Sequence, residues 1–226
     1  MYDRLEDYKK LVEFLSSLLG ENCEVVLQDC REDQCGIIAI GNGAVTNRKV
    51  GGPLTDYALE VIQSKRWKNE DWDINYRSTK NHKNLRSSTY FIKDDNHDLI
   101  GMLCVNIDMT VYEQLSHAIL SLGGLHLLPS IPATTSIEEP HMGPPKETFF
   151  NNIAEMVNMS MEEVFAEEAM PQITRLNLDE RLRLLENLQK KGVFLIKGAI
   201  SEVAAILRCS EPTLYRSLSK CQKTKA

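Results

Sequence analysis

Apolar residues near the N-terminus recur at the spacing of a helix. Over residues 3–19 they lie three or four positions apart, which places them on one stripe of an amphipathic helix, and Gly20 supplies a stop. That stripe consists of Leu5, Tyr8, Val12, Leu15 and Leu19. Thr55 is a suitable N-cap for a second helix that extends to about Lys65. A third helix is predicted over 111–122, with the stripe Tyr112, Leu115, Ile119 and Leu122.

Short apolar runs between these helices predict strands. Two of them cover 24–28 and 36–40, and two longer ones cover 85–93 and 99–109, joined by a hairpin turn at 94–98. In the last strand two sets of residues alternate between the faces: Leu103, Val105 and Ile107 on one, and Met102, Cys104, Asn106 and Asp108 on the other. Residues 66–84 are polar and Asn-rich, so we expect a loop region there. The pattern indicates an α+β N-terminal domain over 1–125.

A proline-rich segment follows and marks the domain boundary. Five of the 8 prolines lie between positions 129 and 145, mixed with Ser and Thr, which predicts an extended and mobile linker over 126–146. These are Pro129, Pro132, Pro140, Pro144 and Pro145. Residues 147–168 have helical spacing and acidic character, so we expect a connecting helix within 147–170.

Residues 171–226 predict an all-α domain that contains a helix-turn-helix. Asn177, with Glu180 three positions later, is a capping pattern for the first helix. A short helix from about 199 to 207 and another from Glu211 to about Lys220 are separated only by a tight turn before the cap Ser210. Small or apolar residues stand where those two helices must pack, namely Val203, Ala204, Leu207, Cys209, Leu214 and Leu218. Arg208 takes the turn position that often holds glycine, which costs more if its φ is positive.

The charge is distributed unevenly along the 226 residues. The whole chain carries a formal net charge of −6, with 26 Lys and Arg against 32 Asp and Glu. Residues 171–226 contain 11 basic and 5 acidic side chains, a net +6, whereas residues 1–170 carry −12. A basic tail on an acidic body favours a polyanion as the partner of that tail, although a solvated basic surface gives the same count.

The outward face of the last helix has side chains suited to a DNA groove. They can donate hydrogen bonds or neutralise phosphate, and they are Ser210, Thr213, Tyr215, Arg216, Ser219 and Lys220. With the basic charge of the tail, they favour binding of double-stranded DNA over a plain three-helix surface.

Two separated motifs then make the chain recognisable. The chain resembles the YheO-like family of bacterial transcriptional regulators in both motifs. The first is Leu85-Arg86-Ser87-Ser88-Thr89 followed by the run from Ile100 to Asp108, and the second, in the tail, is Gly192 to Ala199 with Ser210 to Arg216. The resemblance covers roughly 1–120 and 174–220. It implies an N-terminal PAS-like sensor domain, an antiparallel sheet with flanking helices, and a C-terminal helix-turn-helix.

In a PAS-like sensor, polar residues on the late strands are candidates to line a ligand cavity. We assign this role to Ser87, Thr89, Asn106 and Asp108, beside Cys104, and expect a small polar metabolite such as an amino acid or related carboxylate. Hydrogen bonding at strand edges or exposure to solvent would explain the same residues without a ligand. Cys104 fits core packing better than a redox sensor, because nothing near it in sequence lowers its pKa.

Other function classes find less support. The 6 cysteines are scattered without a C-x-x-C pair, the histidines lack metal-ligand spacing, and H-E-x-x-H, G-x-S-x-G and P-loop motifs are missing from the sequence. We therefore expect no metal, cofactor, enzymatic activity or membrane span, and a cytoplasmic regulator that forms a homodimer through the helices 3–19 and 111–122. A PAS-like protein-interaction adaptor without DNA binding is the alternative, and an enzyme is a weaker one.

Overall fold

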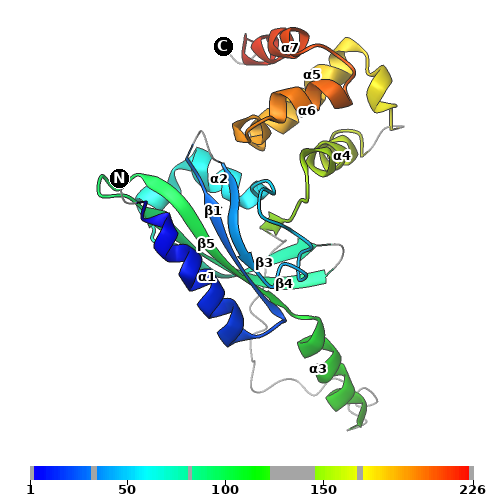
Figure 1. Cartoon of the computed structure of the whole chain (residues 1–226). Helices are drawn as coiled ribbons and strands as arrows, with labels where there is room; N and C mark the ends of the chain where they lie inside the picture. The colour runs from blue at the N-terminus through cyan, green and yellow to red at the C-terminus, as the bar shows by residue number, and fades with distance from the viewer. Residues whose placement is uncertain (1–2, 32–34, 81–82, 123–145, 167–169, 224–226) are drawn as a thin grey trace.

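A six-stranded sheet forms the N-terminal half of the computed structural model, which describes residues 3–31, 35–80, 83–122, 146–166 and 170–223. The strand order is β2-β1-β5-β4-β3-β6, and neighbours run antiparallel except that β6 is parallel to β3 (Figure 1). The strands are β1 (Cys23–Asp29), β2 (Gly36–Gly41), β3 (Trp72–Lys80), β4 (Lys83–Lys93), β5 (Leu99–Asp108) and β6 (Glu147–Thr148). The expected α+β architecture is confirmed.

The helices divide between the sheet and a C-terminal group. Near the sheet are α1 (Leu5–Leu19), α2 (Asp56–Ser64), α3 (Thr110–Leu122) and the short η1 (Arg66–Lys68). The C-terminal group consists of α4 (Ile153–Val164), η3 (Ile173–Arg175), α5 (Leu178–Lys190), η4 (Val193–Leu195), α6 (Ala199–Ile206) and α7 (Glu211–Lys223). Within the described residues, no helix has both the length and the apolar character needed to cross a bilayer.

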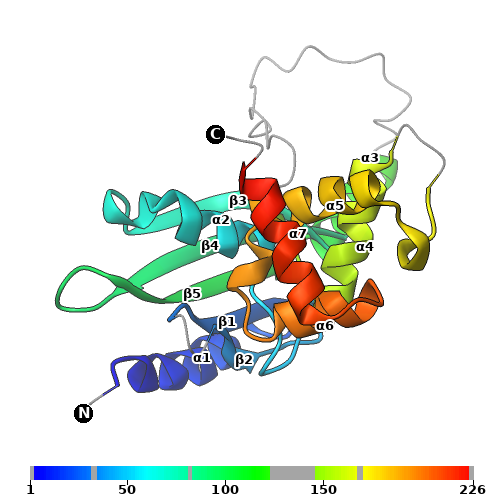
Figure 2. The ribbon, with the colours of Figure 1, turned by 90° about the horizontal axis from the view of Figure 1, so that it is seen from above.

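The two faces of the sheet are covered by different layers. On the outer face, Val25 and Leu27 pack with Leu5 and Val12 of α1. On the inner face, Met102 and Cys104 of β5 join an apolar cluster that extends through α2 into the C-terminal helices. Figures 1 and 2 show α1 on one side of the sheet and α2 with α4–α7 on the other. The alternation predicted for β5 is therefore what separates the two layers.

Residues 72–80 form a strand where we expected a loop. In β3 only Tyr76, Ser78 and Lys80 are buried, and the pairing with β4 shifts register between Asp73 and Tyr76. This irregularity interrupts the two-residue period by which a strand is recognised in sequence. Pairing with β4, rather than local propensity, makes this segment a strand.

The connecting helix also starts later than expected. Residues 147–148 form β6, and the helix α4 begins only at Ile153, where the Asn152 side chain accepts a hydrogen bond of 2.9 Å from the backbone N–H of Glu155. The extended backbone of β6 completes the edge of the sheet instead of winding into a helix. The linker predicted over 126–146 lies, apart from Lys146, outside the described residues, so the domain boundaries remain a prediction.

The helix-turn-helix is formed by α6, a tight turn and α7. Arg208 in this turn has φ 50°, and the backbone N–H of Cys209 donates to the carbonyl of Ala204 at 2.9 Å. A left-handed residue followed by this six-to-one hydrogen bond is the Schellman arrangement that ends many helices, normally with glycine. The sharp turn therefore holds a side chain in a conformation that L-residues disfavour.

Gly192 joins the C-terminal helices to α2 of the sheet domain. It has φ 73°, and a Cβ atom at this position would lie 2.5 Å from the side-chain amide of Gln63 and 3.2 Å from Leu59 Cβ. The Gln63 amide in turn donates to the Lys190 carbonyl and accepts from the Gly192 N–H, each at 3.0 Å. Glycine is required here both for the backbone angle and for the close approach of α2.

The strained turn generates a prediction. We expect Arg208→Gly to raise the free energy of unfolding by about 1 kcal/mol, because glycine adopts a positive φ without the Cβ penalty. Urea unfolding of the full chain measures this, with Arg86→Gly on the sheet as a control that should destabilise. A stability loss in Arg208→Gly would show that the arginine side chain contributes more than its backbone costs.

Candidate DNA-binding helix and buried polar site

The solvent-facing side of α7 presents all six residues that the sequence assigned to DNA. Each of Ser210, Thr213, Tyr215, Arg216, Ser219 and Lys220 is exposed. The opposite side of the helix is buried, with Leu214, Ser217, Leu218 and Cys221 turned toward the other helices. The structure therefore places the predicted residues together on one outward surface.

Packing against α5 and α6 fixes the orientation of α7. Leu214 is fully buried in the same apolar cluster as Val203, Ala204 and Leu207 of the preceding helix. The hydroxyl of Ser201 donates to the Glu211 carboxylate at 2.6 Å, which ties the start of α7 to α6. With the apolar side fixed in this way, the polar side of α7 is presented to solvent as a rigid unit.

The hydroxyl groups on α7 have local roles as well. Ser210 Oγ lies 2.8 Å from Thr213 Oγ1 and accepts from the Thr213 backbone N–H at 3.4 Å, as an N-cap does. Ser219 donates to the Tyr215 carbonyl at 2.9 Å within the helix. Tyr215 is 54% exposed, so a large amphipathic ring stands next to Arg216 on this surface.

Four of the five residues predicted to line a ligand site lie together on the inner face of the sheet. Ser87, Thr89, Cys104 and Asn106 are all buried. Ser87 donates to Asn106 Oδ1 at 2.8 Å, and Thr89 donates to Cys104 Sγ at 3.3 Å. Asp108 is separate from them: its carboxylate accepts from the N–H of Thr110, the first residue of α3, at 2.9 Å and pairs with Lys83 at 3.3 Å.

A buried ion pair that the sequence did not reveal completes this network. Glu24 of β1 is fully buried, and its carboxylate accepts 2.7 Å from Arg48 Nη2 and 2.9 Å from Asn106 Nδ2. Arg48 comes from the loop between β2 and α2, and Thr46 of that loop also donates to Glu24. The only sequence signal was a charged residue at an inward position of a buried strand.

The second part of the network centres on Glu147 of β6, which is 2% exposed. Tyr76 OH lies 3.0 Å from Glu147 Oε2 and 2.8 Å from Thr89 Oγ1, which leads on to Cys104. The Tyr76 hydroxyl donates to Glu147, and the Thr89 hydroxyl donates to Cys104, so the chain of contacts extends from β6 across β3 and β4 to β5. We name these eight residues the inner-face site: Glu24, Arg48, Tyr76, Ser87, Thr89, Cys104, Asn106 and Glu147.

Burial dominates the acid–base properties of this site. Loss of solvation raises the pKa of Glu147 to about 7, although Arg48 and the Thr55 hydroxyl partly oppose the rise. The same effect raises the pKa of Cys104 to about 12. Cys104 therefore stays a thiol at neutral pH, as its assignment to core packing requires, and a reactive thiolate is not favoured.

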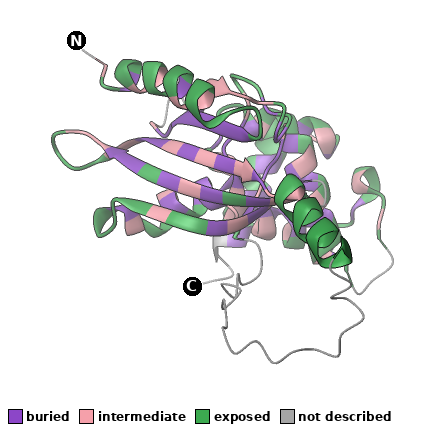
Figure 3. Ribbon diagram, turned by 90° about the horizontal axis from the view of Figure 1, so that it is seen from below, coloured by how far each residue is buried: buried purple, intermediate pink, exposed green. Residues whose placement is uncertain are grey.

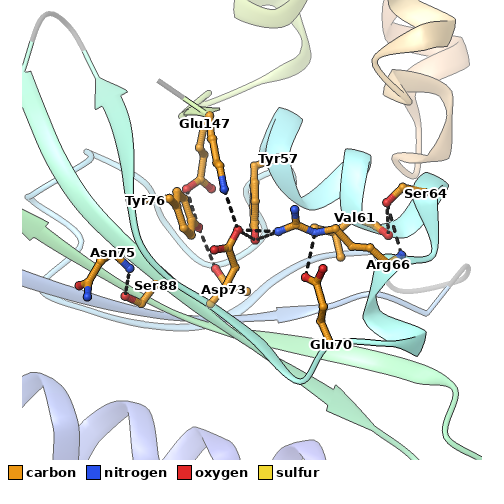
Figure 4. A network of polar contacts seen from close by, with 12 residues as sticks. Tyr57, Val61, Ser64, Arg66, Glu70, Asp73, Asn75, Tyr76, Ser88 and Glu147 are labelled. Atoms are coloured by element: carbon orange, nitrogen blue, oxygen red, sulfur yellow. Dashed lines mark hydrogen bonds and ion pairs between the residues drawn. The ribbon is translucent and has the colours of Figure 1, made fainter. Parts of the chain in front are cut away.

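Charged side chains form a further network at the edge of the inner-face site (Figure 4). Arg66 Nη2 is 2.6 Å from both the Tyr57 hydroxyl and the Asp73 carboxylate, and Lys146 Nζ is 3.3 Å from the same carboxylate. A pocket of about 530 Å³ opens beside this network, lined by residues of α2, α4 and α5 as well as Lys146. It lies where the sheet domain meets the C-terminal helices.

Comparison with known proteins agrees with this arrangement. Residues 1–123 match the model of the YheO-like PAS domain, and residues 156–219 match that of an HTH domain. YheO of Escherichia coli (strain K12) is 29% identical over 216 residues, which cover 95% of this chain and 83% of that protein. A protein of Haemophilus influenzae is 29% identical over 212 residues, covering 93% and 88% of the two chains. The transcriptional regulator DauR of Pseudomonas aeruginosa is 23% identical over 222 residues, covering 97% and 95%.

The PAS model covers more than half of the chain, and the helix-turn-helix match includes α5, α6 and most of α7. Both the fold and these matches confirm the resemblance drawn from the sequence motifs. The chain belongs to the YheO-like PAS family and joins its PAS domain to a C-terminal helix-turn-helix domain.

Proposed function

We propose that this protein is a transcriptional regulator, not an enzyme, that binds double-stranded DNA through α7 and senses a small polar metabolite through its PAS domain. The exposed row of hydrogen-bonding and cationic side chains on α7, the second helix of the helix-turn-helix, carries the first half of this proposal. The similarity to a transcriptional regulator over nearly the whole length of both chains supports it.

The second half of the proposal depends on the inner-face site. Buried polar groups in a sheet cost free energy, and a protein that needed only an apolar core there would be more stable with apolar side chains. The fixed hydroxyl, amide, carboxyl and guanidinium groups of this site are suited to recognise a small polar compound. A thermal-shift screen of metabolites with the full chain would identify it.

We further propose that the protein is a homodimer that pairs through α3. None of the residues of α3 is buried, and Tyr112, Leu115 and Ile119 are each more than half exposed. An isolated helix of 13 residues is marginal in water, so this one needs an apolar partner. Figure 3 shows α3 standing away from the sheet as an exposed helix.

The α1 stripe has a different role from the one we expected. Leu5 and Val12 are buried against the outer face of the sheet, so this stripe stabilises the PAS domain itself. Tyr8 and Leu15 pack against the same cluster, whereas Phe14 and Leu18, at 61% and 65% exposure, face away from the sheet. A second copy of the chain seated on α3 suits a reader of two DNA half-sites roughly 34–36 Å apart.

The DNA-contact residues generate one prediction. We expect Arg216→Ala to weaken binding to a duplex selected from random pools by about 1–3 kcal/mol, because an arginine near the start of a recognition helix contacts a base edge or a phosphate. Lys220→Ala should weaken selected and unselected duplexes alike and lower the slope of log K against log salt by about one unit per half-site. Fluorescence anisotropy in a salt series measures both.

Arg86→Ala serves as the control for these variants, because Arg86 is an exposed arginine on the sheet and not on α7. It should leave both affinities unchanged. If neither Arg216→Ala nor Lys220→Ala alters binding, α7 does not contact DNA.

The α3 surface generates a second prediction. Leu115→Glu should raise the dissociation constant of the dimer on the order of tenfold or more, because it places a charge in the centre of an apolar contact. Sedimentation velocity over a concentration series measures the change. Leu178→Glu is the matched control, since Leu178 is 55% exposed on α5. A wild-type chain that stays monomeric at tens of micromolar would contradict the proposed dimer.

The buried carboxyl of Glu147 generates a third prediction. Its pKa of about 7 in the folded state lies above its ordinary 4.5, so the unfolded chain loses this proton first as the pH rises. This group therefore removes on the order of 3 kcal/mol of stability between about pH 4.5 and pH 7, and little above that range. Glu147→Gln should lose this part of the pH dependence in urea unfolding.

Only the difference between wild type and variant is diagnostic here, because Asp56 also has a raised pKa while those of Asp73 and Glu155 are lowered. Glu162→Gln, at an exposed position of α4, should retain the wild-type pH profile. Identical profiles for Glu147→Gln and wild type would mean that Glu147 is ionised and solvated.

A further inference from the structure

The carboxyl group of Glu147 is held as a bound small carboxylate would be held. It receives a hydrogen bond from the Tyr76 hydroxyl at 3.0 Å, and the Arg48 guanidinium and the Thr55 hydroxyl both favour its ionised form. Hydroxyl donors combined with an arginine are a common way to bind a carboxylate. This carboxyl, however, belongs to the connecting segment (residues 146–150), which follows the part of the chain that matches the PAS domain, residues 1–123.

The connecting segment is attached by few backbone contacts. β6 has only two residues in register with β3, Ser78 opposite Glu147 and Thr79 opposite Thr148. Two further hydrogen bonds hold its backbone, from the Lys146 N–H to the Arg77 carbonyl at 2.9 Å and from the Thr148 N–H to Asp56 at 2.8 Å. Because so short a strand contributes little ladder energy, most of its anchoring comes from side chains at the inner-face site.

Those side chains include Phe149 as well as Glu147. Phe149 is buried, with the Arg48 guanidinium 4.5 Å above its ring, and its carbonyl accepts from Lys80 Nζ at 2.8 Å. Arg48 thus faces both anchoring residues of the segment. A compound that bound to Arg48 would affect both at once.

The site also has hydrogen-bonding capacity that the described residues do not use. Arg48 Nη1 is buried without a partner among them. A buried donor that makes no hydrogen bond is destabilising, so this group needs an explanation. A ligand that accepts a hydrogen bond from Arg48 Nη1 would supply it.

We propose that the ligand of the PAS domain carries a carboxyl group and binds where the Glu147 carboxyl now lies, so that ligand and connecting segment compete for Tyr76, Thr55 and Arg48. This inference rests on the proposed metabolite sensing and gives it a chemical class and a route to the DNA-binding helices. α4 begins four residues after Phe149 and packs against α5 and α6. Release of β6 therefore frees the start of the helical domain from the sheet.

The test uses the full chain with Glu147→Ala and acetate as the probe, because acetate has the atoms that the substitution removes. The variant should melt several degrees below wild type, and saturating acetate should recover most of that loss. Wild type should gain nothing from acetate at the same concentration, since its own Glu147 fills the site. Acetamide is the neutral control, and Glu162→Ala is the control for removing an exposed glutamate from the same part of the chain.

The double variant Glu147→Ala/Tyr76→Phe identifies the site, because it lacks the hydroxyl that donates to the carboxyl. Recovery by acetate in the single variant and none in the double variant would support the proposal. No recovery in Glu147→Ala, or equal recovery with acetamide, would overturn it. If Glu147→Ala fails to fold, it is refolded in each additive: recovery only in acetate supports the proposal, and recovery in neither overturns it.

Amide hydrogen exchange measures the competition between the ligand and the connecting segment. A metabolite that stabilises the wild-type chain should speed exchange of the Lys146 and Thr148 amides and bind Glu147→Ala on the order of tenfold or more tighter, because the variant no longer occupies its own site. A stabilising metabolite that leaves both amides protected and binds the two chains equally would overturn this inference. That result would leave metabolite sensing and DNA binding standing, since each is measured separately.

Discussion

Glu24, on the second strand of the sheet, has no exposure to solvent, and the fold around it depends on how its charge is neutralised. Arg48 provides the neutralising charge from a loop about twenty residues further along the chain, at 2.7 Å. Removing one partner of such a buried pair typically costs 3–5 kcal/mol, because the other is left as an uncompensated charge. The loop between β2 and α2 is therefore tied to β1, and it leads directly to Thr55, the N-cap of α2.

The same arginine links the PAS domain to the segment that follows it. Its guanidinium covers Phe149, and its charge favours the ionised form of Glu147. One buried cation thus organises β1, the loop that covers the inner face, and β6. The inner-face site is consequently a structural centre and a candidate ligand site at once, which is the arrangement expected where binding must change the position of a neighbouring domain.

The contact between the two halves is of two kinds. Near α2 it is close and uncharged: Gly192 lies against Leu59 and hydrogen-bonds to the Gln63 amide, and the apolar core of the sheet continues into the helices. Near the connecting segment it depends on a carboxyl whose pKa is about 7. The uncharged contact does not change with ligand or proton, whereas the one that depends on the carboxyl can respond to both. The second is therefore where regulation is expected to act.

Local signals in the sequence were sufficient to define most helices and the solvent-facing side of α7. Thr55 and Asn177 cap their helices as the side-chain pattern indicated, and in α7 the 3.6-residue period separated Leu214 and Leu218 from Arg216. The inward face of β5 was likewise evident from its two-residue alternation. These features depend on neighbours within about one helical turn or one strand, which is the range over which sequence periodicity acts.

Only the tertiary structure decided β3, β6 and the inner-face site. β3 is polar and interrupted, and β6 has two residues, so neither shows a period; both are strands because a partner strand supplies their hydrogen bonds. Glu24, Arg48 and Glu147 come from three different segments, and apart from the position of Glu24 in an apolar run, no local feature distinguishes them from solvated charges. They lie together because a buried charge is stable only when it is paired or hydrogen-bonded, and which residues are buried depends on the packing of the whole chain.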